Sequence, residues 1–177
     1  MRHLTPADYN RQPWKNGRGL TTEIWRIDAP DGSLLARLSR ASLVEDGPFS
    51  LFPDIERNLT VLWGPGFRIS GPGLSLRCDV LIPVAFPGDL PVEASESGGQ
   101  QSDDFNVMTA RSLPRPEVTV EHDGSDLPAG GLLALYAVDP VTVNGIDMAR
   151  DDLILTETGA RVRGHGPVIA ARLFGLT

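Results

Sequence analysis

Hydrophobic and polar residues alternate with a period near two along most of this sequence. Such alternation is typical of β-strands that turn one face to a core and the other to solvent. The alternating segments span residues 22–27, 34–44, 59–62, 67–69, 74–77, 117–121, 132–138, 141–143, 153–156 and 168–174. The pattern therefore predicts an all-β protein built from many short strands.

Turn sequences separate these segments. The chain contains 19 glycines and 15 prolines, scattered without a period. Asn144-Gly145 lies between Val143 and Ile146, which is the pattern of a two-residue β-hairpin. Short strands joined by tight turns indicate a sandwich or a barrel.

Two segments depart from the strand pattern. Thr5-Pro6-Ala7-Asp8 has the residue order of a helix start, so we predict a short N-terminal lid helix. Residues 93–103 are polar and contain no aromatic residue, which favours a mobile connection. This connection would divide the chain into two β-rich halves, residues 1–103 and 104–177, with a single fused domain as the alternative.

The composition narrows the function classes. The formal net charge is −7 and the isoelectric point is about 4.9, so we expect neither a nucleic acid nor an anionic membrane as partner. Cys78 is the only cysteine, and the first ten residues carry no apolar stretch of the secretory type. No apolar run approaches the roughly 20 residues that span a bilayer. We therefore expect a cytoplasmic protein.

Metal and nucleophile chemistry find little support in the sequence. His3, His122 and His165 are far apart and form no H-x-H or H-x-x-x-H pair, so we expect no bound metal and no cofactor. Cys78 lies in an alternating strand, where a lone cysteine is usually core packing or a passive thiol. The prolines in Gly64-Pro65-Gly66 and Gly71-Pro72-Gly73 remove amides that a phosphate-binding loop would use.

Residues 14–24, W-K-N-G-R-G-L-T-T-E-I, combine an aromatic ring, an amide, two glycines, two hydroxyls and a carboxylate at the start of a strand. Core packing does not require this mixture. The segment is either one wall of a binding site or a glycine-rich turn anchored by Trp14. Composition alone leaves both interpretations open.

One of two neighbouring arginines is predicted to point into the protein. In a strand, Arg37 and Ser39 share one face, and Leu38 and Arg40 share the other. A buried guanidinium needs a partner, and its fork of donors matches a carboxylate. The partner is either Glu23, in a purely structural pair, or a small acidic ligand.

Residues 46–57 form a turn-rich connection that contains Phe49 and Phe52. Aromatic side chains on a loop are expected to fold inward. They would form the apolar wall of a pocket, with Ser50 and Arg57 as polar contacts at its mouth. Alternatively, the two phenylalanines plug the end of the barrel.

Five ordered blocks carry a family resemblance: W-K-N-G-R-G-L-T-T-E-I, R-L-S-R-A, D-G-P-F-S-L-F-P-D-I-E-R, F-P-G-D at 86–89 and D-F-N-V-M at 104–108. Together they resemble the HutD/Ves family, over residues 14 to about 111. The resemblance implies a cupin-type (RmlC-like) β-barrel fold, described for this family as a bicupin, with few short helices.

The resemblance also implies a function. HutD-like proteins are linked to histidine utilisation, and other members of the family to stress-induced expression. The implied role is a metal-free regulatory protein that binds a small acidic intermediate such as urocanate or formylglutamate, and the sequence is compatible with a homodimer. The positions that match the family's ligand-binding residues are Trp14, Asn16, Glu23, Arg37, Ser39, Phe49, Ser50, Arg57, Asp104, Asn106 and Met108.

Two other function classes fit the same residues. A metal-independent isomerase or lyase acting on a small carboxylic acid would use Glu23 or Asp104 as its general base. A protein-interaction module would instead expose a large apolar patch.

Overall fold

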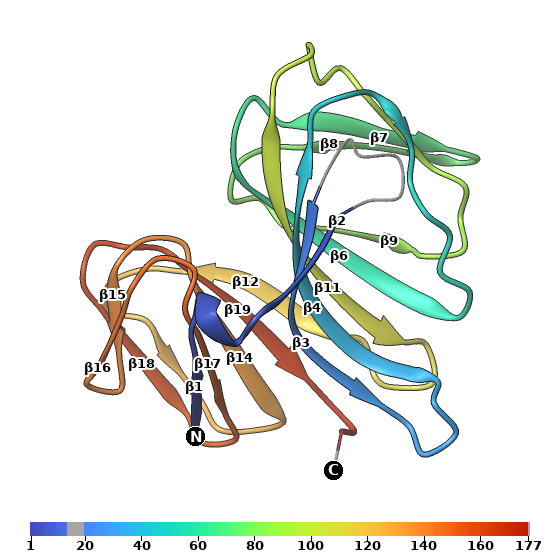
Figure 1. Cartoon of the computed structure of the whole chain (residues 1–177). Coiled ribbons are helices and arrows are strands. Elements are labelled where there is room, and N and C mark those ends of the chain that lie inside the picture. Colours follow the sequence, from blue (N-terminus) through green and yellow to red (C-terminus); the bar gives the residue numbers. More distant parts are fainter. Residues whose placement is uncertain (14–19, 177) are drawn as a thin grey trace. The chain divides into compact units, whose positions relative to one another are not determined.

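The computed structural model describes residues 1–13 and 20–176 (Figure 1). The chain forms two compact units. The central unit is Asn10–Ser112, and the terminal unit combines Met1–Tyr9 with Leu113–Thr177. The predicted division after residue 103 instead falls inside β11 (Ser102–Ala110). Both hydrogen-bonded neighbours of this strand belong to the central unit, so that unit extends beyond the predicted boundary.

The central unit contains two antiparallel sheets. The larger sheet has the order β2 (Asn10–Pro13), β3 (Leu20–Asp28), β4 (Leu34–Leu43), β11, β6 (Ile55–Trp63) and β9 (Val84–Pro87). The smaller sheet has the order β5 (Gly47–Pro48), β10 (Glu93–Ser95), β7 (Phe67–Gly71) and β8 (Leu74–Cys78).

The core of the central unit draws side chains from both of its sheets. Its buried members are Leu43, Leu59, Val61, Phe67, Ile69, Cys78, Phe86, Val92 and Ala94. Within the larger sheet these residues are two apart where they share a strand, as in Leu59 and Val61, so one face of each strand supplies the core. The polar residues on that same face, next to the core, form the site described below.

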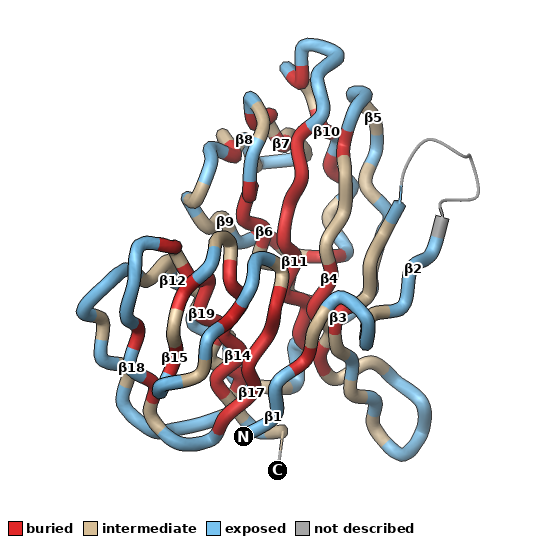
Figure 2. Tube along the Cα trace, turned by 60° about the vertical axis from the view of Figure 1, so that its left-hand side comes forward, coloured by how far each residue is buried: buried red, intermediate tan, exposed pale blue. Residues whose placement is uncertain are grey.

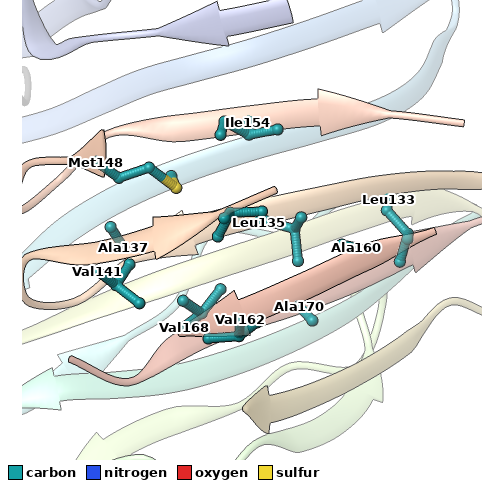
Figure 3. Close-up of a cluster of buried hydrophobic side chains, with 11 residues drawn as sticks. Leu133, Leu135, Ala137, Val141, Met148, Ile154, Ala160, Val162, Val168 and Ala170 are labelled. Atoms are coloured by element: carbon teal, nitrogen blue, oxygen red, sulfur yellow. The ribbon is translucent and has the colours of Figure 1, made fainter. Parts of the chain in front are cut away.

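The terminal unit is also built from two antiparallel sheets. One has the order β1 (Arg2–Leu4), β17 (Leu153–Thr156), β14 (Leu132–Ala137), β19 (Val168–Leu173) and β12 (Glu117–Glu121). The other has the order β13 (Asp126–Leu127), β18 (Ala160–Arg163), β15 (Val141–Val143) and β16 (Ile146–Met148). Figure 3 shows the cluster of aliphatic side chains, with Met148 among them, that both sheets contribute.

Several local predictions are confirmed. The all-β class is correct, and Asn144 and Gly145, at φ 51° and 79°, form the hairpin between β15 and β16. Residues Pro6–Asp8 form η1, a 3-10 helix, and the Asp8 carboxylate accepts hydrogen bonds from the backbone and hydroxyl of Thr5. In the described part of the chain, no helix is long and apolar enough to cross a membrane.

Two predictions are corrected by the structure. The sheets of each unit are not closed into barrels, because the described edge strands of one sheet do not form a continuous ladder with those of the other. Residues 93–103 are not a mere connection, because they contain β10 and the start of β11. Ser97 and Ser102 are buried: the backbone N–H of Ser97 donates to Asp46 Oδ1 at 3.0 Å, and the Ser102 hydroxyl oxygen accepts a hydrogen bond from Gly66 N at 3.0 Å.

Candidate functional site

A cavity of about 600 Å³ lies against the larger sheet of the central unit. Strands β2, β3, β4, β5, β6 and β11 and the segment after β5 supply its walls. The lining residues are Gln12, Thr21, Arg37, Ser39, Ala41, Leu43, Pro48, Phe49, Ser50, Phe52, Arg57, Asp104, Asn106 and Met108. The volume is within the range of small-molecule sites, roughly 300–1,000 Å³.

Strand register brings the polar side chains together. Arg57 on β6 and Arg37 on β4 both lie opposite Met108 on β11, one on each side. The next positions on the same face of β11 are Asn106 and Asp104, because side chains two apart share a face. Figure 2 shows that β11 is buried along nearly its whole length. Two cations therefore flank a buried strand that presents an amide and a carboxyl.

Arg57 is a buried cation surrounded by aromatic rings. Its side chain is 5% exposed, and its Cζ lies 5.0 Å from the ring centroid of Phe49, 5.5 Å from that of Phe52 and 5.0 Å from that of Phe86. Cation–π attraction compensates part of the desolvation cost. Arg57 Nη2 donates to Asn106 Oδ1 at 3.0 Å, whereas the buried Nε has no hydrogen-bond partner among the described residues. Desolvation lowers the pKa of Arg57 to about 10, so the side chain is still a cation at neutral pH.

Backbone hydrogen bonds hold the phenylalanine-bearing loop over Arg57. Phe49 N donates to Val92 O at 3.0 Å, and Phe52 N donates to Gly88 O at 2.8 Å. Gly88 N in turn donates to Ile55 O at 2.7 Å. A Cβ at position 88 would lie 2.8 Å from the carbonyl oxygens of Ile55 and Phe52, so this close approach requires glycine.

Arg37 forms the second cationic contact of the cavity. Its Nε lies 2.8 Å from Glu23 Oε2, and the two side chains are 12% and 18% exposed. Despite this short distance, the buried Nε makes no hydrogen bond with any residue that the structure describes. The structure thus resolves which arginine faces inward: it is Arg37, and Glu23 is its ion-pair partner.

Asp104 is the buried acid of the site. It is 2% exposed, and its Oδ1 accepts a short hydrogen bond from Asn106 Nδ2. Asn106 therefore links Arg57 to Asp104 through its two amide atoms. Burial raises the pKa of Asp104 to about 7, against the opposing attraction of the Arg57 charge. A carboxyl with this pKa exchanges its proton near neutral pH.

The sequence matches a known protein family over most of its length. The HutD family model matches residues 6–169. The chain belongs to the HutD family. This confirms the resemblance carried by the sequence blocks.

Solved structures agree with the HutD assignment. A conserved protein of unknown function from Pseudomonas aeruginosa PAO1 is 30% identical, with a TM-score of 0.85 and coverage of 98% of each chain. HutD from Pseudomonas fluorescens SBW25 is 26% identical, with a TM-score of 0.85 and coverage of 98% of this chain and 99% of that one. The pirin YhhW from Escherichia coli, in complex with nickel(II), is 10% identical over 97% and 98% of the two chains, with a TM-score of 0.66. The last of these shows a cupin-like fold alone.

Most of the residues expected from the HutD resemblance meet at this cavity. Arg37, Ser39, Phe49, Ser50, Arg57, Asp104, Asn106 and Met108 all line it. Glu23 contacts it through Arg37. Trp14 and Asn16 lie outside the described residues. The structure therefore supports one shared location for the described residues of the set, while their role in binding is still a prediction.

Sequence reasoning missed other residues of the site. They are Gln12, Ala41, Leu43 and Pro48 in the wall of the cavity and Phe86 over Arg57. Thr21 also lines the cavity, and it belongs to the segment 14–24 that the sequence had marked as a possible wall. A period of two was the available signal for two of the missed residues, because Ala41 and Leu43 continue the face of Arg37 and Ser39. Nothing in the sequence pairs Phe86 with Arg57, since that contact depends on the register between β6 and β9.

The opposite face of the sheet carries a separate ion pair. Arg40 Nη2 donates to Asp103 Oδ2 at 2.6 Å, and Ser42 Oγ and Gln101 Nε2 donate to Asp103 Oδ1 at 2.7 and 2.9 Å. These groups keep the pKa of Asp103 low even though burial opposes this. Adjacent aspartates on β11 thus differ in ionisation because one is fully paired and the other is not.

Metal and thiol chemistry have no visible basis in the described residues. They contain no group of three or more His, Cys, Asp or Glu side chains placed to hold a metal ion. Cys78 packs in the core of the central unit, and burial raises its pKa to about 12. A thiol of this kind is a poor nucleophile.

Proposed function

We propose that this HutD-family protein binds a small carboxylate in the central-unit cavity, with Arg57 as the principal anchor and Arg37 as a second cationic contact. It would act as a regulatory protein of histidine utilisation, with an intermediate such as urocanate or formylglutamate as its ligand. The family membership and the similarity to HutD from Pseudomonas fluorescens support the link to histidine utilisation.

The observation that carries this proposal is the environment of Arg57. No carboxylate among the described residues lies within ion-pair distance of this buried cation; its direct neighbours are three phenylalanine rings and one neutral amide, and the Asp104 carboxyl attracts it only from beyond that amide. A buried charge without a direct counter-ion is costly, and its fork of donors matches a carboxylate. A ligand anion would supply the missing charge.

The rest of the cavity suits the remainder of such a ligand. Phe49, Phe52, Leu43 and Met108 offer apolar surface, and Ser39 offers a hydroxyl. A flat or short-chain acid could place its carboxylate at Arg57 and its carbon skeleton against the rings. A second acidic group of the ligand would pair with Arg37, which lies on β4, across β11 from Arg57.

Thermal-shift titration with urocanate, formylglutamate and glutarate tests the proposal. At a concentration one hundred times its Kd, a ligand stabilises the folded state by about 2.7 kcal/mol, which raises the Tm of a chain of this length by roughly 5–10 °C. The Arg57→Met variant should lose this shift. Arg26→Met is the matched control, because Arg26 is exposed on β3 and pairs with Asp28. Absence of any shift across the panel, confirmed by calorimetry, would contradict the proposal.

One observation favours an enzyme as the second candidate. Asp104 has a pKa of about 7, which suits a general acid or base at neutral pH. Conversion of urocanate or a related acid by the wild-type protein, abolished in Asp104→Asn and retained in Arg26→Met, would favour an isomerase or lyase. Binding without turnover would favour the regulatory function.

A further inference from the structure

Asp104 occupies an unusual electrostatic position in the cavity. It lies on the central strand β11, is 2% exposed and receives its side-chain hydrogen bond from Asn106. Arg57 reaches it through that same amide, since Arg57 Nη2 donates to Asn106 Oδ1. Asp104 is therefore the carboxyl that balances the Arg57 charge at a distance, without a direct ion pair among the described residues.

The other charged and titratable groups around Asp104 come from every neighbouring strand. They are Arg57 on β6, Arg37 and Arg40 on β4, Glu23 on β3, Cys78 on β8 and Asp103 on β11 itself. Glu23 pairs with Arg37, Asp103 pairs with Arg40, and Cys78 is a neutral thiol. Among the described residues, Arg57 and Asp104 are then the two charged side chains of the cavity that form no ion pair.

An anion bound at Arg57 changes this balance. It brings a second negative charge into a buried site that already contains the Asp104 carboxylate. Two carboxylates that share a buried site do not both stay ionised, because each raises the pKa of the other. The bound ligand also competes with Asp104 for the field of Arg57, which is the main attraction that favours the ionised form.

We propose that carboxylate binding at Arg57 is coupled to the uptake of one proton by Asp104, so that the protein binds its ligand more tightly as the pH falls. This inference rests on the function proposed above. The proton comes from the buffer and bonds to an Asp104 carboxyl oxygen. The resulting neutral acid leaves the ligand as the sole counter-ion of Arg57, and its hydroxyl can donate to a carboxylate oxygen.

The free protein is suited to such coupling. Burial raises the pKa of Asp104 to about 7, so the protonated form makes up roughly 90% of the free protein at pH 6 and roughly 10% at pH 8. If only this form binds, the apparent Kd is divided by that fraction, and affinity should fall about tenfold from pH 6 to pH 8. Proton uptake should be near one per ligand at pH 8 and about 0.1 at pH 6.

Isothermal titration calorimetry measures both quantities. Formylglutamate and glutarate are the probes, because their carboxylates stay ionised between pH 6 and pH 8, whereas the imidazole of urocanate titrates in this range. Titrations at pH 6, 7 and 8 in non-carboxylate, non-phosphate buffers of high and low ionisation enthalpy give the number of protons taken up. We expect the tenfold change in Kd together with uptake that rises towards one proton at pH 8.

Variants separate Asp104 from other groups. In Asp104→Asn the coupling should disappear: no proton uptake, and a Kd that stays constant from pH 6 to pH 8 near the wild-type value at pH 6. Asp28→Asn is the control, because Asp28 is an exposed carboxylate on β3 of the same unit, and it should keep the wild-type pH dependence. Retention of the uptake in Asp104→Asn would overturn the inference.

The outcomes distinguish this inference from the function on which it rests. Binding with a constant Kd and no proton uptake would overturn the coupling and leave the proposed function intact. Absence of binding heat for both probes at every pH would contradict the proposed function and the coupling with it. Should Asp104→Asn fail to fold, carboxyl ¹³C NMR of the wild-type protein tests the coupling instead. The Asp104 resonance should titrate near pH 7 in the free protein and above pH 8 in the complex. The same titration in both states would refute the coupling.

Discussion

Replacing Asp104 with asparagine removes a buried charge while it preserves the size of the side chain. The ordinary pKa of an aspartate is 3.8, and that of Asp104 is raised to about 7. Between these values the folded protein binds more protons than the unfolded chain, so the stability contributed by Asp104 is fully present below pH 3.8 and is lost as the pH rises through 7. The slope is ~1.4 kcal/mol per pH unit, which gives a loss of about 3 kcal/mol between pH 5 and pH 8 for this side chain.

Asparagine does not titrate, so the variant should escape this loss. Relative to the wild type, Asp104→Asn should gain about 3 kcal/mol more at pH 8 than at pH 5. Guanidinium chloride unfolding followed by tryptophan fluorescence measures this difference in unfolding free energy. The signal reports on the central unit, because Trp14, Trp25 and Trp63 all belong to its sequence. Parallel pH profiles for the two proteins would refute the claim that Asp104 is buried as a weakly compensated acid.

Three further substitutions test the close packing at Gly88, the buried hydroxyl of Tyr136 and the ion pair between Glu23 and Arg37. Gly88→Ala should cost roughly 1–3 kcal/mol of stability, measured by chemical unfolding, because the new Cβ would lie 2.8 Å from two backbone carbonyl oxygens; an unchanged midpoint would contradict the close approach. Tyr136→Phe should cost roughly 1.5–3 kcal/mol, because a fully buried hydroxyl donates to Asp151 Oδ1 at 2.6 Å. Glu23→Gln should strengthen carboxylate binding by roughly 2–10-fold in calorimetry, because Arg37 loses its ion-pair partner; weaker binding would show that Glu23 itself holds the ligand.

The sequence predicted strands of two kinds. The alternation in residues 34–44 and 74–77 matches β4 and β8 closely, and the mostly apolar segments 132–138, 153–156 and 168–174 match β14, β17 and β19, which are buried on both faces. The sequence did not predict β11, because its buried residues include Asp103, Asp104 and Asn106 and show no alternation. The prediction for residues 93–103 was wrong for a related reason: Ser97 and Ser102 are buried and make hydrogen bonds through backbone and hydroxyl groups, which composition does not reveal.

The candidate site was likewise predicted only in part from the sequence. Alternation placed Arg37 and Ser39 on one face, and the family blocks supplied Asp104, Asn106 and Met108, yet neither could show that three strands align these positions side by side. The segment 46–57 predicted an apolar wall but not that its rings surround Arg57. The pKa values of Asp103 and Asp104 diverge because of strand register and burial. The sequence shows only two adjacent aspartates and gives no sign of this difference.

A crystal structure of the protein grown with formylglutamate would show whether Arg57 anchors a carboxylate. We expect density for a carboxylate within hydrogen-bond distance of the Arg57 guanidinium, against the rings of Phe49 and Phe52. Ligand density at another place, with ordered water alone beside Arg57, would contradict it.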